Sequence, residues 1–228
     1  MNVGEGARHF QHDLELLRSQ LLDMSVLAEE LLRTAVEALV EGDAAKADSV
    51  ILGDRELDAA EVEVDEAGIN LLARHQPFAR DLRLITMILR IANDLERVGD
   101  HAVNIAETVH HLGAVPAPLS RFPQIEEMAQ IGRDMLTQAL DSFVRGDSAS
   151  AREVCRRDDL VDSLHNTGFR SLLTLMTEDP RWVGTGMSLI LVGRNLERVA
   201  DLATNVAEDV VYMVEGKSIK HGADRDEQ

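Results

Sequence analysis

Apolar residues recur every three or four positions along most of the chain. The first stretch shows the spacing plainly, with Leu14, Leu17, Leu21, Met24 and Ala28 in succession. Side chains at this spacing share one face of a helix, so the pattern predicts an amphipathic helix over 10–41. Five further helices are predicted over 44–74, 79–111, 124–145, 148–178 and 181–215. No stretch alternates polar and apolar residues for long enough to predict a strand.

Short breaks separate these helices. Gly42-Asp43 and Gly146-Asp147 each end one helix and offer an aspartate as the N-cap of the next. Pro77 marks another turn, because the residue before a proline avoids helical backbone angles. The segment GAVPAPLSRFP at 113–123 holds three of the chain's five prolines, and it is predicted to be a linker.

The chain repeats itself. NDLERVGDHAVNIAE at 93–107 is echoed by RNLERVADLATNVAE at 194–208, and the segment 38–58 aligns with 142–162. We therefore expect an all-α fold of two tandem three-helix bundles, with six long antiparallel helices related by a pseudo-twofold internal repeat. The first bundle covers 1–112 and the Pro-rich linker covers 113–123. The second bundle covers 124–228 and ends in a short polar tail.

The composition is helical and strongly acidic. Aromatic residues make up 3%, and 41 acidic residues against 23 basic ones give a formal net charge of −18. Such a surface repels nucleic acid and anionic lipid, whereas it can attract cations or a basic partner. The single Cys155 excludes an internal disulfide. The N-terminus lacks a signal-peptide core, and the longest uncharged run, 182–193, is short of the about 20 residues that a membrane span needs. We expect a cytoplasmic protein.

Oxygen-bearing side chains line one stripe of the third predicted helix, and the sixth repeats that stripe. The two sets are Glu96, Asp100, Asn104 and Glu107, and then Glu197, Asp201, Asn205 and Glu208. Each set falls within roughly 80° of the helix circumference. Like charges at this spacing cost about 0.2–0.5 kcal/mol per pair. A charged stripe on its own is commonly a solvated face, but its duplication favours a binding role.

The second and fifth helices add carboxylates in matching positions, Asp54 with Asp58 and Asp158 with Asp162. If neighbouring helices pack side by side, the acidic stripes face one another. Oxygen-only clusters suit Mg²⁺, Mn²⁺ or iron, and more than one ion can share such a cluster. These twelve residues are the predicted metal ligands.

An oxygen-ligated metalloprotein or metalloenzyme of the di-iron carboxylate type is the alternative interpretation. It requires a Glu-x-x-His pair on two helices. Glu107-Thr-Val-His110 is one such pair, but the second copy reads Glu208-Asp-Val-Val211 and has no histidine. The chain also has no Walker loop and no nucleophile elbow, so no enzymatic activity is predicted. A third possibility is a metal or phosphate buffer that has no partner.

The doubled segments LERVGDHAVNIAE and LERVADLATNVAE resemble the signature of the PhoU family, the accessory regulators of bacterial phosphate-specific transport. HQPFARDLR at 75–83 and EGKSIKH at 215–221 are also similar to segments of that family. The resemblance covers nearly the whole chain. It implies two three-helix bundles in tandem.

The resemblance also implies a function. Family members are cytoplasmic, often dimeric, and act as negative regulators of phosphate uptake and of the phosphate-starvation response. They connect the phosphate ABC transporter, through its ATPase subunit, to a sensor histidine kinase, so membrane association is expected only through partners. Some bind metal through Glu/Asp-x-x-x-Asp motifs. Here these motifs stand at Asp54/Asp58, Glu96/Asp100, Asp158/Asp162 and Glu197/Asp201.

The two copies are not identical where it matters for this function. Gly99 is replaced by Ala200 in the second copy, and His101 by Leu202. Arg80 and Arg83, which follow Pro77, have no counterpart after Pro180. Two interpretations of these arginines stay open: a docking spot for a partner, or an ordinary helix surface.

Overall fold

The chain was analysed as a computed structural model that describes residues 3–113 and 117–220. Within these ranges it folds into six α-helices and two short 3-10 helices, with no strand. The α-helices are α1 (Val3–Glu41), α2 (Ala44–His75), α3 (Ala79–His111), α4 (Pro123–Arg145), α5 (Ser148–Glu178) and α6 (Val183–Glu215). The 3-10 helices are η1 (Leu119–Arg121) and η2 (Pro180–Trp182).

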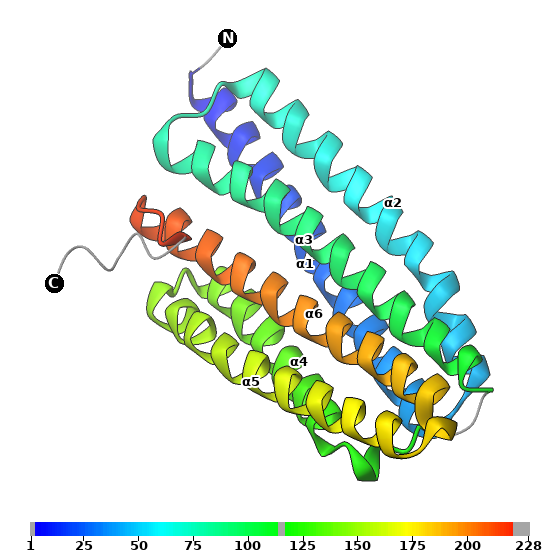
Figure 1. The fold of residues 1–228 in the computed structure, drawn as a ribbon. Coiled ribbons are helices and arrows are strands. Elements are labelled where there is room, and N and C mark those ends of the chain that lie inside the picture. Colours follow the sequence, from blue (N-terminus) through cyan, green and yellow to red (C-terminus); the bar gives the residue numbers. More distant parts are fainter. Residues whose placement is uncertain (1–2, 114–116, 221–228) are drawn as a thin grey trace, which may run out of the picture.

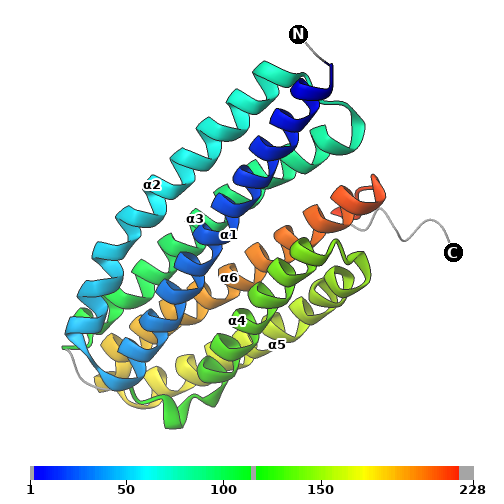
Figure 2. The ribbon, with the colours of Figure 1, turned by 180° about the vertical axis from the view of Figure 1, so that it is seen from behind.

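The helices form two bundles of three. Helices α1, α2 and α3 pack on one another, as do α4, α5 and α6, and α3 packs against α6 between the bundles (Figure 1; Figure 2). The two tandem three-helix bundles predicted from the sequence repeat are therefore confirmed. None of the described helices contains a stretch long and apolar enough to cross a membrane.

The predicted N-caps form as expected. Oδ1 of Asp43 accepts hydrogen bonds from the backbone N–H groups of Ala45 and Lys46, at 2.8 and 3.1 Å. Oδ1 of Asp147 accepts from the N–H of Ser150 at 3.0 Å. Gly146 ends α4 with φ of +63°, in the left-handed region that glycine adopts without strain. These caps satisfy helix-end donors and fix the α1–α2 and α4–α5 turns.

Helix boundaries differ from the sequence-based ones mainly at two places. α1 begins at Val3 rather than at residue 10, so it also includes Gly4 and Gly6, which precede the apolar repeat. α6 begins at Val183, after the 3-10 helix η2. The 3-10 helix η2 is capped by Asp179, whose side chain accepts a hydrogen bond from the N–H of Arg181 at 3.1 Å.

The segment predicted as a linker contributes to the core. Residues 114–116 lie outside the described ranges, but Leu119 and Phe122 are buried. The Phe122 ring meets the Trp182 ring edge to face, with centroids 6.4 Å apart. The N–H of Ala117 also donates to the carbonyl of Leu39 at 3.2 Å, which joins this segment to α1. The connection between the repeats is thus packed against both bundles.

The contact between α3 and α6 forms the centre of the molecule. Small and branched side chains of both helices are fully buried, among them Val98, Ala102, Val199 and Ala203. Polar contacts flank this apolar centre, because Nδ1 of His101 lies 2.9 Å from Oδ1 of Asn195, and Arg90 pairs with Asp209 at 3.4 Å. The core is continuous across the two bundles.

Candidate carboxylate sites

Carboxylates of α2 and α3 gather into a first cluster, which we define as Asp54, Asp58, Glu61, Glu96 and Asp100. Burial and the negative charges of Asp58 and Asp100 raise the pKa of Asp54. Burial and the other four carboxylates raise the pKa of Glu96 in the same way. Asp54 of α2 lies against the backbone of α3 at Gly99, and the charge of Asp100 acts on it, so the acidic stripes of the two helices face one another, as the sequence predicted.

A second cluster, Asp158, Asp162 and Asp201, lies between α5 and α6, and Glu197 is one turn before Asp201 on α6. Burial, together with the charges of Asp201 and Asp162, raises the pKa of Asp158 to about 6. The clusters thus arise at equivalent places in the two repeats.

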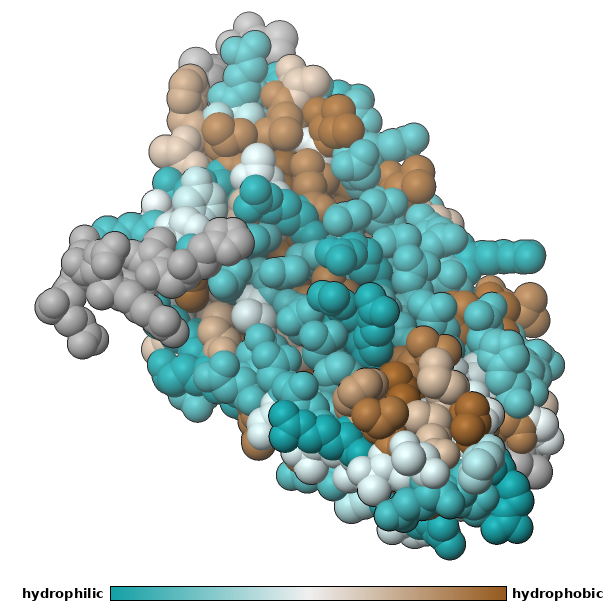
Figure 3. All heavy atoms as spheres, viewed as in Figure 1, coloured by the Kyte–Doolittle hydropathy of each residue, from teal (hydrophilic) through white to brown (hydrophobic). Residues whose placement is uncertain are grey.

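On the face shown in Figure 3, a broad hydrophilic band crosses the middle of the molecule between hydrophobic areas above and below it.

A close helix approach holds the first cluster together. A Cβ added to Gly99 would stand 2.4 Å from Cδ2 of Leu57 and 2.9 Å from Oδ1 of Asp54. Only glycine therefore lets α3 approach α2 closely enough to place Asp54 against its backbone. In the second bundle the equivalent residues are Ala200 and the smaller Val161, both fully buried. In the first bundle the small residue of this contact is on α3, opposite Leu57, whereas in the second bundle the α5 residue is smaller and α6 has alanine.

Equivalent arginines turn in opposite directions at the two clusters. Arg97 pairs with Asp94, one turn back on α3, at 3.4 Å. Arg198 instead pairs with Asp201 at 2.9 Å and approaches Glu197 at 3.6 Å. The position of Asp94 is held by the neutral Asn195 in the second copy, so Arg198 has no anion on that side. Only the second cluster therefore has a guanidinium that balances its α6 carboxylates.

A further difference lies at the position of Glu61. The second copy has His165 there, and its ring carbon Cδ2 lies 3.5 Å from where a Cβ on Gly193 would stand. Glu61 lies three residues after Asp58 on α2. The structure adds it to the first cluster, because its charge raises the pKa of Glu96.

The C-terminal half of each predicted stripe, Asn104 with Glu107 and Asn205 with Glu208, is not part of these clusters. No hydrogen bond, ion pair or pKa shift of a described residue links the side chains of Asn104, Glu107 or Asn205 to the clusters. Glu208 lies near Cys155, and burial together with this charge raises the pKa of the thiol to about 11. Cys155 is therefore an unreactive packing residue at neutral pH.

The histidine of the Glu107-x-x-His110 pair has another role. Nε2 of His110 lies 3.1 Å from Oδ1 of Asp48 on α2, so it joins α2 and α3 near their ends. A di-iron carboxylate site of the four-helix type requires Glu-x-x-His on two helices, and the second repeat has Val211 at the position of this histidine.

The donor set of both clusters fits a hard cation. All donors are carboxylate oxygens, and the raised pKa values of Asp54, Glu96 and Asp158 show that uncompensated charge is held close together. In their present conformations, no three or more His, Cys, Asp or Glu side chains of the described residues converge on one point suited to a metal ion. A bound ion would therefore require the carboxylates to rotate towards it.

A buried acidic pair between the bundles was not found from the sequence. Asp94 and Asp209 are 9% and 1% exposed. Burial and the charge of Asp209 raise the pKa of Asp94 to about 6. Asp209 is balanced by Arg90 at 3.4 Å and by Lys220 at 3.1 Å. No sequence signal separates these two from solvated acids, because their burial follows from the α3–α6 packing.

Comparison with known proteins connects these features. A family model described as the PhoU domain matches residues 21–109 and again residues 125–210. The chain belongs to the PhoU family. The two matches coincide with the two bundles, so each repeat is one PhoU domain and each contains one carboxylate cluster.

Curated relatives extend over most of the chain. A "Phosphate-specific transport system accessory protein PhoU homolog" of Pseudomonas putida is 37% identical over 94% of this chain and 84% of the relative. The protein with the same name from Aquifex aeolicus is 40% identical over 92% of this chain and 94% of its own length. These PhoU proteins are named as accessory proteins of a transport system.

Solved PhoU structures have the same fold. The crystal structure of PhoU from Pseudomonas aeruginosa superposes with a TM-score of 0.88 at 37% identity, covering 91% of this chain and all of that one. The phosphate transport system regulatory protein PhoU from Streptococcus pneumoniae gives a TM-score of 0.85 at 25% identity, covering 92% of this chain and 99% of that one. The membership of this chain in the PhoU family is thus supported by sequence and by structure together.

Proposed function

We propose that the chain is a cytoplasmic regulatory adaptor that restrains phosphate uptake and represses the phosphate-starvation response. The observation that carries this proposal is the match of both repeats to the PhoU domain, in a chain whose relatives are named accessory proteins of phosphate-specific transport. The adaptor is not an enzyme and acts by binding.

The partners proposed are the ATPase subunit of the phosphate ABC transporter and a sensor histidine kinase. Two bundles that meet mainly along α3 and α6, with a smaller contact between α1 and α4, leave the outer surfaces of α2 and α5 apart from each other, which suits a protein that contacts two partners. A second copy of the chain is also a proposed partner, in a homodimer. The net charge of −18 favours basic partner surfaces and disfavours nucleic acid.

The two carboxylate clusters are proposed to bind a divalent metal or iron. Asp54, Asp58, Glu96 and Asp100 would hold it in the first bundle, and Asp158, Asp162, Glu197 and Asp201 in the second. When bound, the cation supplies positive charge that compensates the repulsion between facing helices. Without a cation, burial and neighbouring carboxylates keep the pKa values of Asp54, Glu96 and Asp158 raised.

Deleting the gene tests the regulatory role. In phosphate-rich medium, cells without the protein should take up more phosphate and express a phosphate-starvation reporter constitutively, and the intact gene should reverse both. Unchanged uptake and a repressed reporter in the deletion strain would contradict the proposed function. Co-purification of the tagged chain with the transporter ATPase and with the kinase then tests each partner separately.

A further inference from the structure

A cavity of about 260 Å³ lies between the bundles, at the end where α3 begins and where α4 and α6 end. Three arginines from three helices line it, namely Arg18 of α1, Arg80 of α3 and Arg145 of α4. Its lining contains no aspartate or glutamate. Such a lining is unexpected in a chain with 41 acidic residues.

Two of these arginines, Arg18 and Arg80, have no carboxylate partner among the described residues. Arg80 makes no hydrogen bond or ion pair with any described residue. Arg18 donates to the backbone carbonyl of Val144 and lies over the Phe143 ring, 5.6 Å from its centroid. Arg145 alone has an anionic partner, Asp141 one turn away, at 3.4 Å and exposed to solvent. Most of the positive charge at the cavity is therefore uncompensated.

A fourth arginine lies beside the cavity. Arg83 is one turn beyond Arg80 on α3, and its guanidinium carbon is 3.6 Å from where a Cβ on Gly216 would stand. Its Nε is buried and has no hydrogen-bond acceptor among the described residues. A buried donor without an acceptor costs about 1–3 kcal/mol, so an acceptor supplied from outside the chain would be favoured here.

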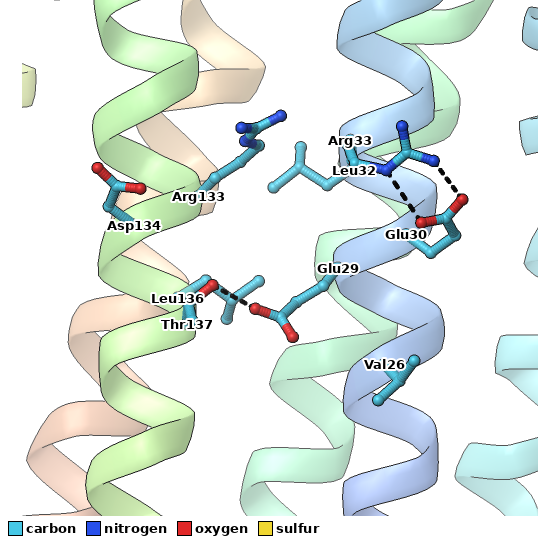
Figure 4. A pocket seen from close by; sticks show the side chains of 9 residues that line it. All are labelled: Val26, Glu29, Glu30, Leu32, Arg33, Arg133, Asp134, Leu136 and Thr137. Atoms are coloured by element: carbon cyan, nitrogen blue, oxygen red, sulfur yellow. Dashed lines mark hydrogen bonds and ion pairs between the residues drawn. The ribbon is translucent and has the colours of Figure 1, made fainter.

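The cavity between the middle parts of α1 and α4 provides a contrast (Figure 4). It has a volume of about 360 Å³ and is also lined by arginines, Arg33 and Arg133. There, however, Arg33 pairs with Glu30 and Glu37, and Glu29 accepts a hydrogen bond from Thr137. Three acidic residues, Glu29, Glu30 and Asp134, line this cavity together with the two arginines, whereas no acidic residue lines the end cavity.

Helix dipoles explain only part of the arginine cluster. The C-terminus of a helix favours a nearby cation by about 0.3–1 kcal/mol, which accounts for Arg145 at the end of α4. Arg80 is in the first turn of α3, where the dipole disfavours a cation. The N-cap of α3, Phe78, makes no side-chain hydrogen bond, and one acidic residue, Asp81, lies in that turn without lining the cavity. An anion at this helix end would stabilise Arg80.

We propose that the end cavity is a binding site for inorganic phosphate, with Arg80 and Arg145 as its main ligands and Arg18 beside them. Guanidinium groups bind tetrahedral oxyanions through paired N–H donors. A water molecule occupies about 30 Å³, so the cavity has room for the anion and part of its hydration shell. The arginines assign an oxyanion, and the choice of phosphate among oxyanions rests on the proposed function.

The position of the site gives the ligand a structural effect. Arg18 and Arg80 belong to the first bundle and Arg145 to the second. An anion held by both sets would link the bundles at this end, so phosphate would favour the conformation in which they are close. A ligand changes a conformational equilibrium only through such a difference in affinity between two states.

Equilibrium dialysis of the full chain against radiolabelled orthophosphate tests the site. We expect one phosphate per chain at low ionic strength. Arg80→Gln and Arg145→Gln should each weaken binding at least tenfold, because each removes a charge-assisted ligand at the cavity. Arg170→Gln is the matched control, since Arg170 is exposed on α5 and lies nearer the far end of that helix. It should bind phosphate as the parent does.

Two results would overturn the proposal: no phosphate bound by the parent at millimolar concentration, or unchanged binding by both cavity variants while circular dichroism shows them folded. The dialysis needs no transporter or kinase. If phosphate binds but gene deletion leaves uptake unchanged, the regulatory function fails and the site stands. If deletion derepresses uptake but no phosphate binds, the site fails alone.

Discussion

The two bundles contain the same carboxylates but balance them differently. In the first, Arg97 turns away to Asp94, so five carboxylates of α2 and α3 face one another without a guanidinium. In the second, Arg198 pairs with Asp201, and His165 occupies the position of Glu61. One neighbouring position, Asp94 against Asn195, decides where the arginine goes. The difference shows that two repeats can keep the same carboxylates while the negative charge left for a cation to compensate differs between them.

The largest expected effect is on metal binding. After incubation with Mg²⁺, Mn²⁺ or iron, Glu96→Ala with Asp100→Ala should lower metal affinity at least tenfold. The pair Glu197→Ala with Asp201→Ala should lower it less, because Arg198 already compensates those carboxylates. Elemental analysis and titration of folded variants measure both. An equal loss from the two pairs, or a larger one from the second, would show that the arginine does not decide the difference.

A second effect concerns the close helix approach in the first bundle. Gly99→Ala should lower the free energy of unfolding by about 2–3 kcal/mol, because its Cβ would overlap Leu57 and Asp54. Adding Leu57→Val copies the second bundle and should recover at least half of this loss. Urea unfolding measures the free energies. If the double variant is as unstable as Gly99→Ala alone, the Leu57 contact is not the cause.

A smaller effect is expected at the buried acid between the bundles. The pKa of Asp94 is about 6 in the folded chain, against an ordinary 3.8. The folded chain therefore keeps a proton that the unfolded chain releases, and the free energy of unfolding falls as pH rises from 4 to 6. Asp94→Asn should remove this fall and add about 1–2 kcal/mol at pH 7.5, with screening and the lost Arg97 pair allowed for.

Unfolding curves at pH 4 and pH 7.5 check this prediction. The two proteins should be closest in stability at pH 4, where Asp94 is protonated in the folded chain. Asp65→Asn, at an exposed position on α2, is the control and should change neither curve. A stabilisation by Asp94→Asn that is as large at pH 4 as at pH 7.5 would exclude titration of this carboxyl as its source.

The smallest effect reverses the balance in the second bundle. Arg198→Gln removes a half-exposed ion pair of a kind worth about 0.2–1 kcal/mol. The second cluster should then bind a cation about two- to fivefold more tightly, as 1.4 kcal/mol corresponds to tenfold. Arg97→Gln serves as the matched variant and should leave the affinity of the first cluster unchanged. Titration with Mn²⁺ distinguishes them, and equal changes in both variants would contradict the comparison.

The fold followed from local signals in the sequence. Apolar spacing predicted the helices, and Asp43 and Asp147 cap them where expected, because caps act within one turn. The facing of Asp54 with Asp100 was also predictable, since it requires only that neighbouring helices pack side by side. The metal itself stays a prediction.

Features that depend on contacts distant in sequence were not predictable. The opposite directions of Arg97 and Arg198 depend on a residue one turn away whose effect is decided by burial against α6. The end cavity brings arginines from three helices together, and no spacing along the chain shows this. Phe122 was assigned to a linker because prolines surround it, yet the second bundle buries it.

The α3–α6 contact also bears on the history of the chain. A face that packs a helix against its own repeat is the face that a symmetric dimer of one three-helix unit would use. In such a dimer every substitution would occur twice, once on each side of the axis. Two copies in one chain are free of that constraint. Here one side of the α3–α6 contact has the buried acidic pair Asp94 and Asp209, whereas the equivalent positions on the other side are Asn195 and Thr108.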